Sequence, residues 1–173
     1  MILAGALEKF KTLELKMSEV YLWCSISFED LELRQFFADM SDEELSHARA
    51  LENITKIPAV KDINFDIPDY LPERIGQNLA EIFARLKQEK GLDKIFLHLA
   101  ELESSEINQA FDSILKGVND ANIQRVDFLS SSTRRHILML ASQAEKLNLS
   151  DDIRQKIGQI CVTDRDYFKL FIP

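Results

Sequence analysis

The fold is decided by LELKMSEVYLWCSISF at residues 13–28 and LELRQFFADMSDEELSHARAL at residues 31–51. Both stretches have the apolar periodicity of an amphipathic helix, and each carries ionisable side chains in phase with its apolar face. These side chains are Glu14 in the first stretch and Glu44 and His47 in the second. Because an unpaired buried carboxylate is costly, the pattern predicts an internal polar site.

The spacing of these three residues recurs later in the chain. Glu44 and His47 follow Glu14 by 30 and 33 residues. Thr133 and His136 follow Glu103 by the same intervals. The second set therefore repeats the first, with a hydroxyl in place of one carboxylate. A carboxylate on one helix that faces a Glu-x-x-His pair on the next is half of a dinuclear metal site, and two halves complete it. Glu106 lies one turn after Glu103 and adds a carboxylate to the same helix face.

Composition limits the function classes. The chain has 173 residues, with 46% hydrophobic and 29% charged residues, which is typical of one globular domain over residues 1–173. The net charge of −8 argues against nucleic acid or an anionic membrane as a partner, because such binding needs clustered Lys and Arg. We find no signal peptide and no apolar run long enough to span a membrane, so we expect a cytoplasmic protein.

Nearly the whole sequence shows helical periodicity, and only five Gly and four Pro occur. We expect helices over residues 3–28, 31–57, 72–90, 92–116 and 120–147, and a short one over 151–160. The three prolines within residues 58–72 predict a crossover that interrupts the helical pattern. The prediction is an all-α fold, a four-helix bundle of two helical hairpins with a long crossover and extra short helices.

The intervals also fit the heights of residues in such hairpins. Glu14 lies 16 residues before a turn near Asp30, and Glu44 lies 14 residues after it. Because each residue of a helix adds the same rise, the two carboxylates stand at nearly the same level of an antiparallel pair. The second hairpin has the same intervals about a turn near Asn119. A pseudo-twofold bundle therefore brings both sets to one level.

These residues resemble those of the rubrerythrin-like branch of the ferritin-like superfamily. The first hairpin, LELKMSEVY…LELRQFFADMSDEELSHARAL, matches through Glu14, Tyr21, Glu44 and His47. The second, LAELESSEINQAF…RVDFLSSSTRRHILML, matches through Glu103, Glu106 and His136. The similarity covers about residues 5–145. It departs from the family at Thr133, where a bridging carboxylate is expected, and in the absence of the paired Cys-x-x-Cys module.

The resemblance implies a carboxylate-bridged di-iron centre that reduces peroxide or oxidises Fe(II). Glu14 and Glu103 are then terminal ligands, Glu44 a bridge, and His47 and His136 nitrogen donors. Glu106 moves to cover for the missing acid at Thr133. Tyr21 either supports the ligands or is a core tyrosine. Two irons per chain are expected, with manganese or zinc as competitors. We also expect a homodimer and an external electron donor.

Two other functions remain open on the sequence. A degenerate bundle with one metal or none is expected to act as a binding or assembly module, using the apolar tail Tyr167–Ile172 as an interface. A mononuclear or zinc hydrolytic site is the third possibility, although no base is evident beyond the ligands. Other ionisable residues are interpreted as surface groups: His98 as a surface or packing histidine, and Asp42, Glu43, Glu101 and Asp112 as the solvated face.

Overall fold

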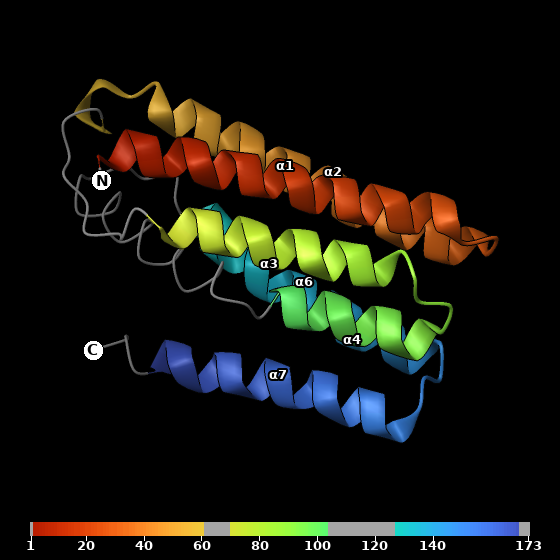
Figure 1. Ribbon diagram of the computed structural model, residues 1–173. Helices are drawn as coiled ribbons and strands as arrows, with labels where there is room; N and C mark the ends of the chain where they lie inside the picture. The colour runs from red at the N-terminus through yellow and green to blue at the C-terminus, as the bar shows by residue number, and fades with distance from the viewer. Residues whose placement is uncertain (1, 61–69, 104–126, 170–173) are drawn as a thin grey trace.

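The computed structural model is a bundle of α-helices packed side by side (Figure 1). It describes residues 2–60, 70–103 and 127–169, and the side chains of these residues except 59, 127–134 and 161–169. The elements are α1 (Leu3–Ser27), α2 (Leu31–Thr55), the 3₁₀ helix η1 (Pro58–Val60), α3 (Leu71–Leu86), α4 (Leu92–Glu103), α6 (Asp127–Lys146) and α7 (Asp151–Lys169). The predicted all-α class is confirmed.

The first predicted hairpin is confirmed as α1 and α2, which run antiparallel along their full lengths (Figure 1). The Asp30 side chain caps α2, because its Oδ1 accepts a hydrogen bond from the Leu33 N–H at 2.9 Å. Ser18 and Ser41 form a buried hydroxyl pair at 2.9 Å between the two helices. Such small side chains let the helices approach closely about one turn away from Glu14 and Glu44.

The remaining helices form the rest of the bundle. α3 lies on α1, while α4 packs against α6 and α7. In Figure 1, α1 and α2 lie at one side of the bundle and α7 at the other, with α3, α4 and α6 between them. α4 and α6 run in opposite directions, as the second hairpin requires. The predicted turn near Asn119 lies outside the described residues.

An aromatic cluster joins α1, α2 and α4 within one continuous core. Phe37 is its centre, with ring centroids 5.6 Å from Phe28, 5.1 Å from Phe36, 5.8 Å from Phe96 and 6.4 Å from Tyr21. Phe37, Phe96 and Tyr21 are completely buried. Aromatic side chains bury large apolar areas in cores, so this cluster is a major contribution to bundle stability. Tyr21 connects it to the polar site.

Two predicted helix boundaries are wrong. The helix predicted as short over 151–160 continues to Lys169 as α7, and no proline interrupts the sequence before Pro173. α3 ends at Leu86 rather than near residue 90. The N–H of Gln88 bonds the Arg85 carbonyl at 2.9 Å, a three-residue interval that tightens the last turn and ends the helix.

α1 is apolar on more than its core-facing side. Leu15, Leu22 and Ile26 are 41%, 53% and 68% exposed, and their spacing of seven and four residues places them on one outer face. None of the helices in the described ranges combines the length and apolar character that a membrane crossing requires.

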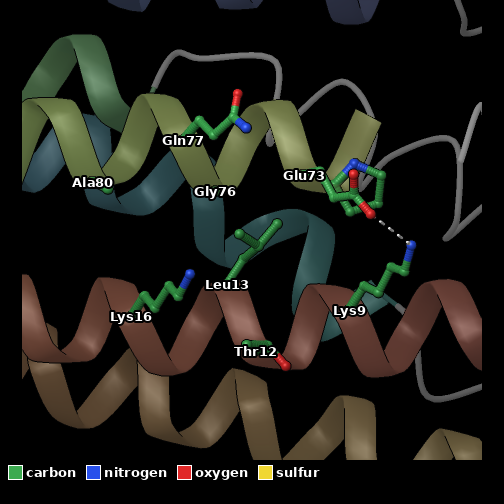
Figure 2. Close-up of a pocket in the computed structure, with 9 residues that line it drawn as sticks. Lys9, Thr12, Leu13, Lys16, Glu73, Gly76, Gln77 and Ala80 are labelled. Carbon is green, nitrogen blue, oxygen red and sulfur yellow. Dashed lines mark ion pairs between the residues drawn. The ribbon is translucent and has the colours of Figure 1, made fainter. Parts of the chain in front are cut away.

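A groove of about 440 Å³ separates the first half of α1 from α3 (Figure 2). It is lined by Lys9, Thr12, Leu13, Lys16, Pro72, Glu73, Gly76, Gln77 and Ala80. Lys9 reaches across it to Glu73, with Nζ 3.9 Å from Oε1. Both partners are substantially exposed, so this ion pair contributes little stability.

Replacing Gly76 by alanine will stabilise the protein. A Cβ at this position meets Leu13 Cδ2 at 3.6 Å and Lys16 Nζ at 3.7 Å, which are ordinary contact distances. Since glycine within a helix costs roughly 0.5–1 kcal/mol relative to alanine, we expect a gain of that size in the free energy of unfolding. Urea denaturation measures it. Gly158→Ala is a matched test in α7, where nothing lies within 4 Å, and a loss of stability in both variants would contradict the prediction.

Candidate metal centre

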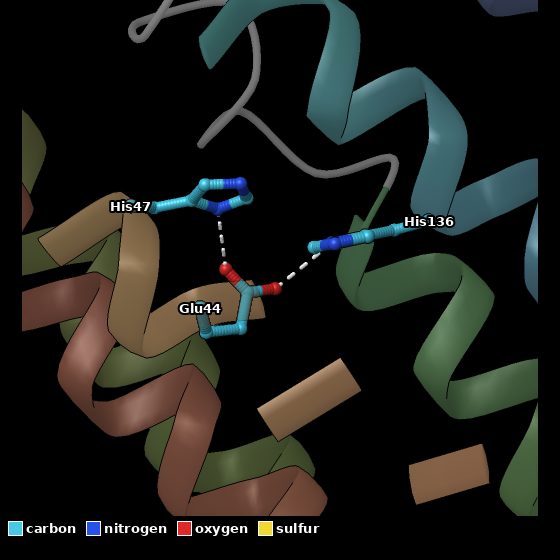
Figure 3. A group of neighbouring side chains, drawn as sticks. All are labelled: Glu44, His47 and His136. Carbon is cyan, nitrogen blue, oxygen red and sulfur yellow. Dashed lines mark hydrogen bonds and ion pairs between the residues drawn. The ribbon is translucent and has the colours of Figure 1, made fainter. Parts of the chain in front are cut away.

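Glu44 stands at the centre of a buried group of histidines and glutamates (Figure 3). Its Oε2 lies 2.9 Å from Nδ1 of His47, one turn further along α2. Its Oε1 lies 3.0 Å from Nδ1 of His136 on α6. All three residues are at most 2% exposed. The two oxygens of the Glu44 carboxylate thus face two different imidazoles, each at its Nδ1 atom.

A second carboxylate flanks each imidazole. Glu14 on α1 places Oε2 3.5 Å from Nδ1 of His47, and Glu103 at the end of α4 places Oε1 3.6 Å from Nδ1 of His136. Both carboxylates are buried, and the two imidazole centroids are 5.3 Å apart. The order Glu14, His47, Glu44, His136, Glu103 is nearly symmetric about Glu44. The four helices of the two hairpins therefore converge at one level, as the sequence intervals predict.

The donor spacings match those of ligands that share an ion. At a metal–ligand bond of about 2.1 Å, neighbouring ligands lie about 3.0 Å apart in an octahedron and about 3.4 Å apart in a tetrahedron. Nδ1 of His47 has carboxylate oxygens at 2.9 and 3.5 Å, and Nδ1 of His136 has them at 3.0 and 3.6 Å. In each case the shorter distance is near the octahedral value and the longer one near the tetrahedral value. The donor atoms of Glu44, His47 and His136 all lie within 4.8 Å of one another. These spacings are compatible with a metal ion held among these residues.

Electrostatics show how strongly these groups interact. Burial, reinforced by the charge of Glu44, raises the pKa of the Glu14 carboxyl to about 8. Burial lowers the pKa of His47, but hydrogen bonds to Glu14 and Glu44 outweigh it and raise the value to about 9. Burial likewise opposes ionisation of Glu44, yet hydrogen bonds from His136 and His47 hold its pKa well below the usual range. The pKa of His136 is raised well above its usual value by Glu103, Glu43 and Glu44, against the effect of burial.

Tyr21 supports the ligand set from α1. Its hydroxyl donates a short hydrogen bond to Oε1 of Glu103 and is completely buried. Burial and the charges of Glu103 and Glu44 raise the pKa of the Tyr21 hydroxyl well above its usual range, so it remains a donor. The sequence left two roles open for Tyr21, support of the ligands or packing in the core. The structure places Tyr21 in both positions, in contact with Glu103 and within the aromatic cluster.

A Tyr21→Phe variant will lose stability. The change leaves the ring packing intact but removes a donor from the buried Glu103 carboxylate, a loss that costs about 1–3 kcal/mol. Chemical denaturation of the metal-free protein measures it. Tyr70→Phe removes the same hydroxyl from a side chain that is 59% exposed and serves as the control. Equal stability of the two variants would show that the Tyr21 hydroxyl does not stabilise the folded protein.

No family model, curated protein or solved structure matches this chain. Among the described residues, three carboxylates and two imidazoles form an oxygen-rich set of donors with a minority of nitrogens. The structure shows a buried group of Glu and His residues that can hold a metal ion.

Two predicted site residues fall where the structure describes no side chain. Glu106 lies outside the described residues, and the side chain of Thr133 is not described although its backbone belongs to α6. Their roles stay predictions. His98 lies away from the centre, with Nδ1 3.3 Å from Glu101 on the same helix, which agrees with a packing or surface histidine.

The interpretation of Glu43 as a solvated residue is wrong. Its Oε2 lies 3.1 Å from Nε2 of His136, and its Oε1 lies 3.1 Å from Arg135. The hydrogen bond from His136 lowers the pKa of the Glu43 carboxyl, against partial burial. Periodicity alone places Glu43 on the flank of α2, and the approach of α6 to that flank is a tertiary contact. The one sequence signal for it is the pair of adjacent acids, Glu43 and Glu44, opposite the adjacent bases Arg135 and His136.

Proposed function

We propose that the protein is a ferritin-like, rubrerythrin-like di-iron carboxylate protein that reduces hydrogen peroxide or oxidises Fe(II). The observation that carries the proposal is the position of Glu44, whose two oxygens face Nδ1 of His47 and of His136. A carboxylate so placed can bridge two ions, each with one imidazole. Glu14 and Glu103 then complete the two halves as terminal ligands.

The balance of charges also favours a metal. Among the described residues, three buried carboxylates face two imidazoles, and the metal-free site keeps Glu14 protonated, because burial and the charge of Glu44 raise its pKa to about 8. A purely structural ion-pair network gains most when its charges match, because an uncompensated buried charge is strongly destabilising. A divalent ion in place of these protons allows all three carboxylates to ionise beside a positive charge. Binding is then coupled to proton release from the ligands.

When bound, the iron pair supplies the two electrons that reduce one molecule of hydrogen peroxide. The chain's own residues hold and enclose the centre. Tyr21 orients Glu103 through its hydroxyl, and the aromatic cluster around Phe37 closes one side to water. The chain has two cysteines and no Cys-x-x-Cys pair, so we infer that its electrons come from another protein.

Anaerobic titration of Fe(II)-loaded protein with hydrogen peroxide tests this function. Reduction of one peroxide to water takes two electrons, so we expect oxidation to end at one peroxide for every two Fe(II), with recovery after a chemical reductant. The signal is the ferric absorbance. A His47→Gln variant, which lacks one nitrogen donor, will show no such endpoint. Bound iron that peroxide leaves ferrous would contradict the redox function while leaving metal binding intact.

A second candidate is a bundle that serves as an assembly module, and the exposed apolar face of α1 favours it. Leu15, Leu22 and Ile26 follow one another along that face, and a twofold pairing of two copies covers the same patch on both. The tail Tyr167–Ile172, the interface expected from the sequence, has no described side chains. A Leu22→Gln/Ile26→Gln variant that stays as large as the wild type by light scattering would exclude an interface on α1.

A further inference from the structure

The imidazole of His136 is held at both nitrogens by consecutive residues of α2. Glu44 Oε1 lies 3.0 Å from Nδ1, on the side of the candidate metal centre. Glu43 Oε2 lies 3.1 Å from Nε2, on the opposite side of the ring. Both contacts are made by carboxylates, which accept hydrogen bonds from ring N–H groups. A rotation of the ring would break both contacts at once, so its orientation is fixed.

Arg135 holds Glu43 in this position. Its guanidinium lies 3.1 Å from Oε1 of Glu43, which leaves Oε2 for His136. Two adjacent bases of α6 thus face two adjacent acids of α2. An arginine stays protonated at any ordinary pH, so the Glu43 carboxylate keeps a cationic partner independent of the state of the histidine. Glu43 is only partly buried, with 23% of its side chain exposed, while the ring of His136 is enclosed.

We propose that Glu43 is a positioning residue that keeps the proton of His136 on Nε2 and so presents the Nδ1 lone pair to the metal centre. The proposal rests on the proposed metal function. Glu43 accepts the Nε2–H bond, and in a neutral imidazole the other nitrogen is then the acceptor, available to an ion. Carboxylates in this position raise the basicity of a ligating histidine and fix its orientation. Glu43 therefore acts on the centre without touching the ion.

Zinc affinity tests the proposal, because Zn²⁺ binds carboxylates and imidazoles without redox chemistry. We compare the wild type with Glu43→Leu, Glu43→Gln and the control Asp42→Asn, using competition with a chromophoric chelator. Loss of such a carboxylate typically weakens metal affinity about 10- to 100-fold, which is the effect expected for Glu43→Leu. Glu43→Gln keeps an oxygen acceptor and will recover part of the affinity. Asp42, the preceding and exposed residue, will have no effect.

Nitrogen-15 NMR of the zinc-loaded protein separates positioning from a general loss of stability. The chain has only three histidines, so the ring signals of His136 can be assigned. We expect metal-bound Nδ1 and protonated Nε2 in the wild type and in Glu43→Gln, and altered Nε2–H signals in Glu43→Leu. Unchanged zinc affinity and unchanged His136 signals in both Glu43 variants would overturn the proposal while the metal function stands. A wild type that binds no zinc would count against both.

Discussion

A Glu44→Gln variant will lose most of its metal affinity. Glu44 is the residue whose oxygens face both His47 and His136, so its charge and its two donor positions serve both halves of the centre. Outer residues that only orient a ligand change metal affinity about 10- to 100-fold, and we expect removal of this central ligand to exceed that range. Equilibrium dialysis against Fe(II) or Zn²⁺, followed by elemental analysis, measures the loss.

Asp42→Asn is the matched control for Glu44→Gln. It removes the same charge by the same chemical change, two residues earlier on α2, from a side chain that is exposed. Its affinity should equal that of the wild type. Circular dichroism of both variants verifies that the helices are retained. Wild-type affinity in Glu44→Gln would show that the buried group is an ion-pair network and not a ligand set.

The metal-free protein will lose stability as the pH rises from about 4.5 to about 9. The pKa of Glu14 is raised to about 8 in the folded state, so above its ordinary value of 4.5 the unfolded chain ionises while the folded one does not. The pKa of His47 is raised from 6.5 to about 9, so its stabilising protonation is lost as the pH rises through that value. In both cases the folded state binds more protons, and stability falls with pH. Glu14 and His47 contact each other, so the two shifts do not add, and at about 1.4 kcal/mol per pKa unit the loss is on the order of a few kcal/mol.

Denaturant unfolding of chelator-treated protein at a series of pH values measures this slope. Glu14→Gln removes one of the groups whose pKa is raised in the folded state and will flatten the curve between about pH 4.5 and 8. Metal replaces the protons, so the stabilisation by added Zn²⁺ will increase over the same interval. Stability of the metal-free wild type that is constant or rises over this range would contradict the electrostatic account of the site.

The sequence predicted the level at which the centre lies because helical rise converts intervals into heights. Glu14 meets His47 across the first hairpin, and Glu103 meets His136 at the same level, as the repeated intervals require. The apolar phase of these residues also predicted their burial. Local periodicity was sufficient here because each residue is positioned by its own helix face.

What the sequence did not predict depends on contacts between helices. Glu43 lies on the flank of α2, and only the approach of α6 turns that flank into a contact with His136. α7 also extends beyond the predicted end at residue 160, to Lys169. The opposite error was to extend α3 to the next glycine. Its actual end is set by a tightened last turn before that point.

The metal content of the protein after anaerobic Fe(II) loading tests the central claim most directly. The protein is purified without chelators, loaded, freed of unbound iron by gel filtration and analysed for iron against the protein concentration. The position of Glu44 between two imidazoles, each flanked by a second carboxylate, predicts two irons per chain. Protein that retains no iron after this treatment would contradict the account.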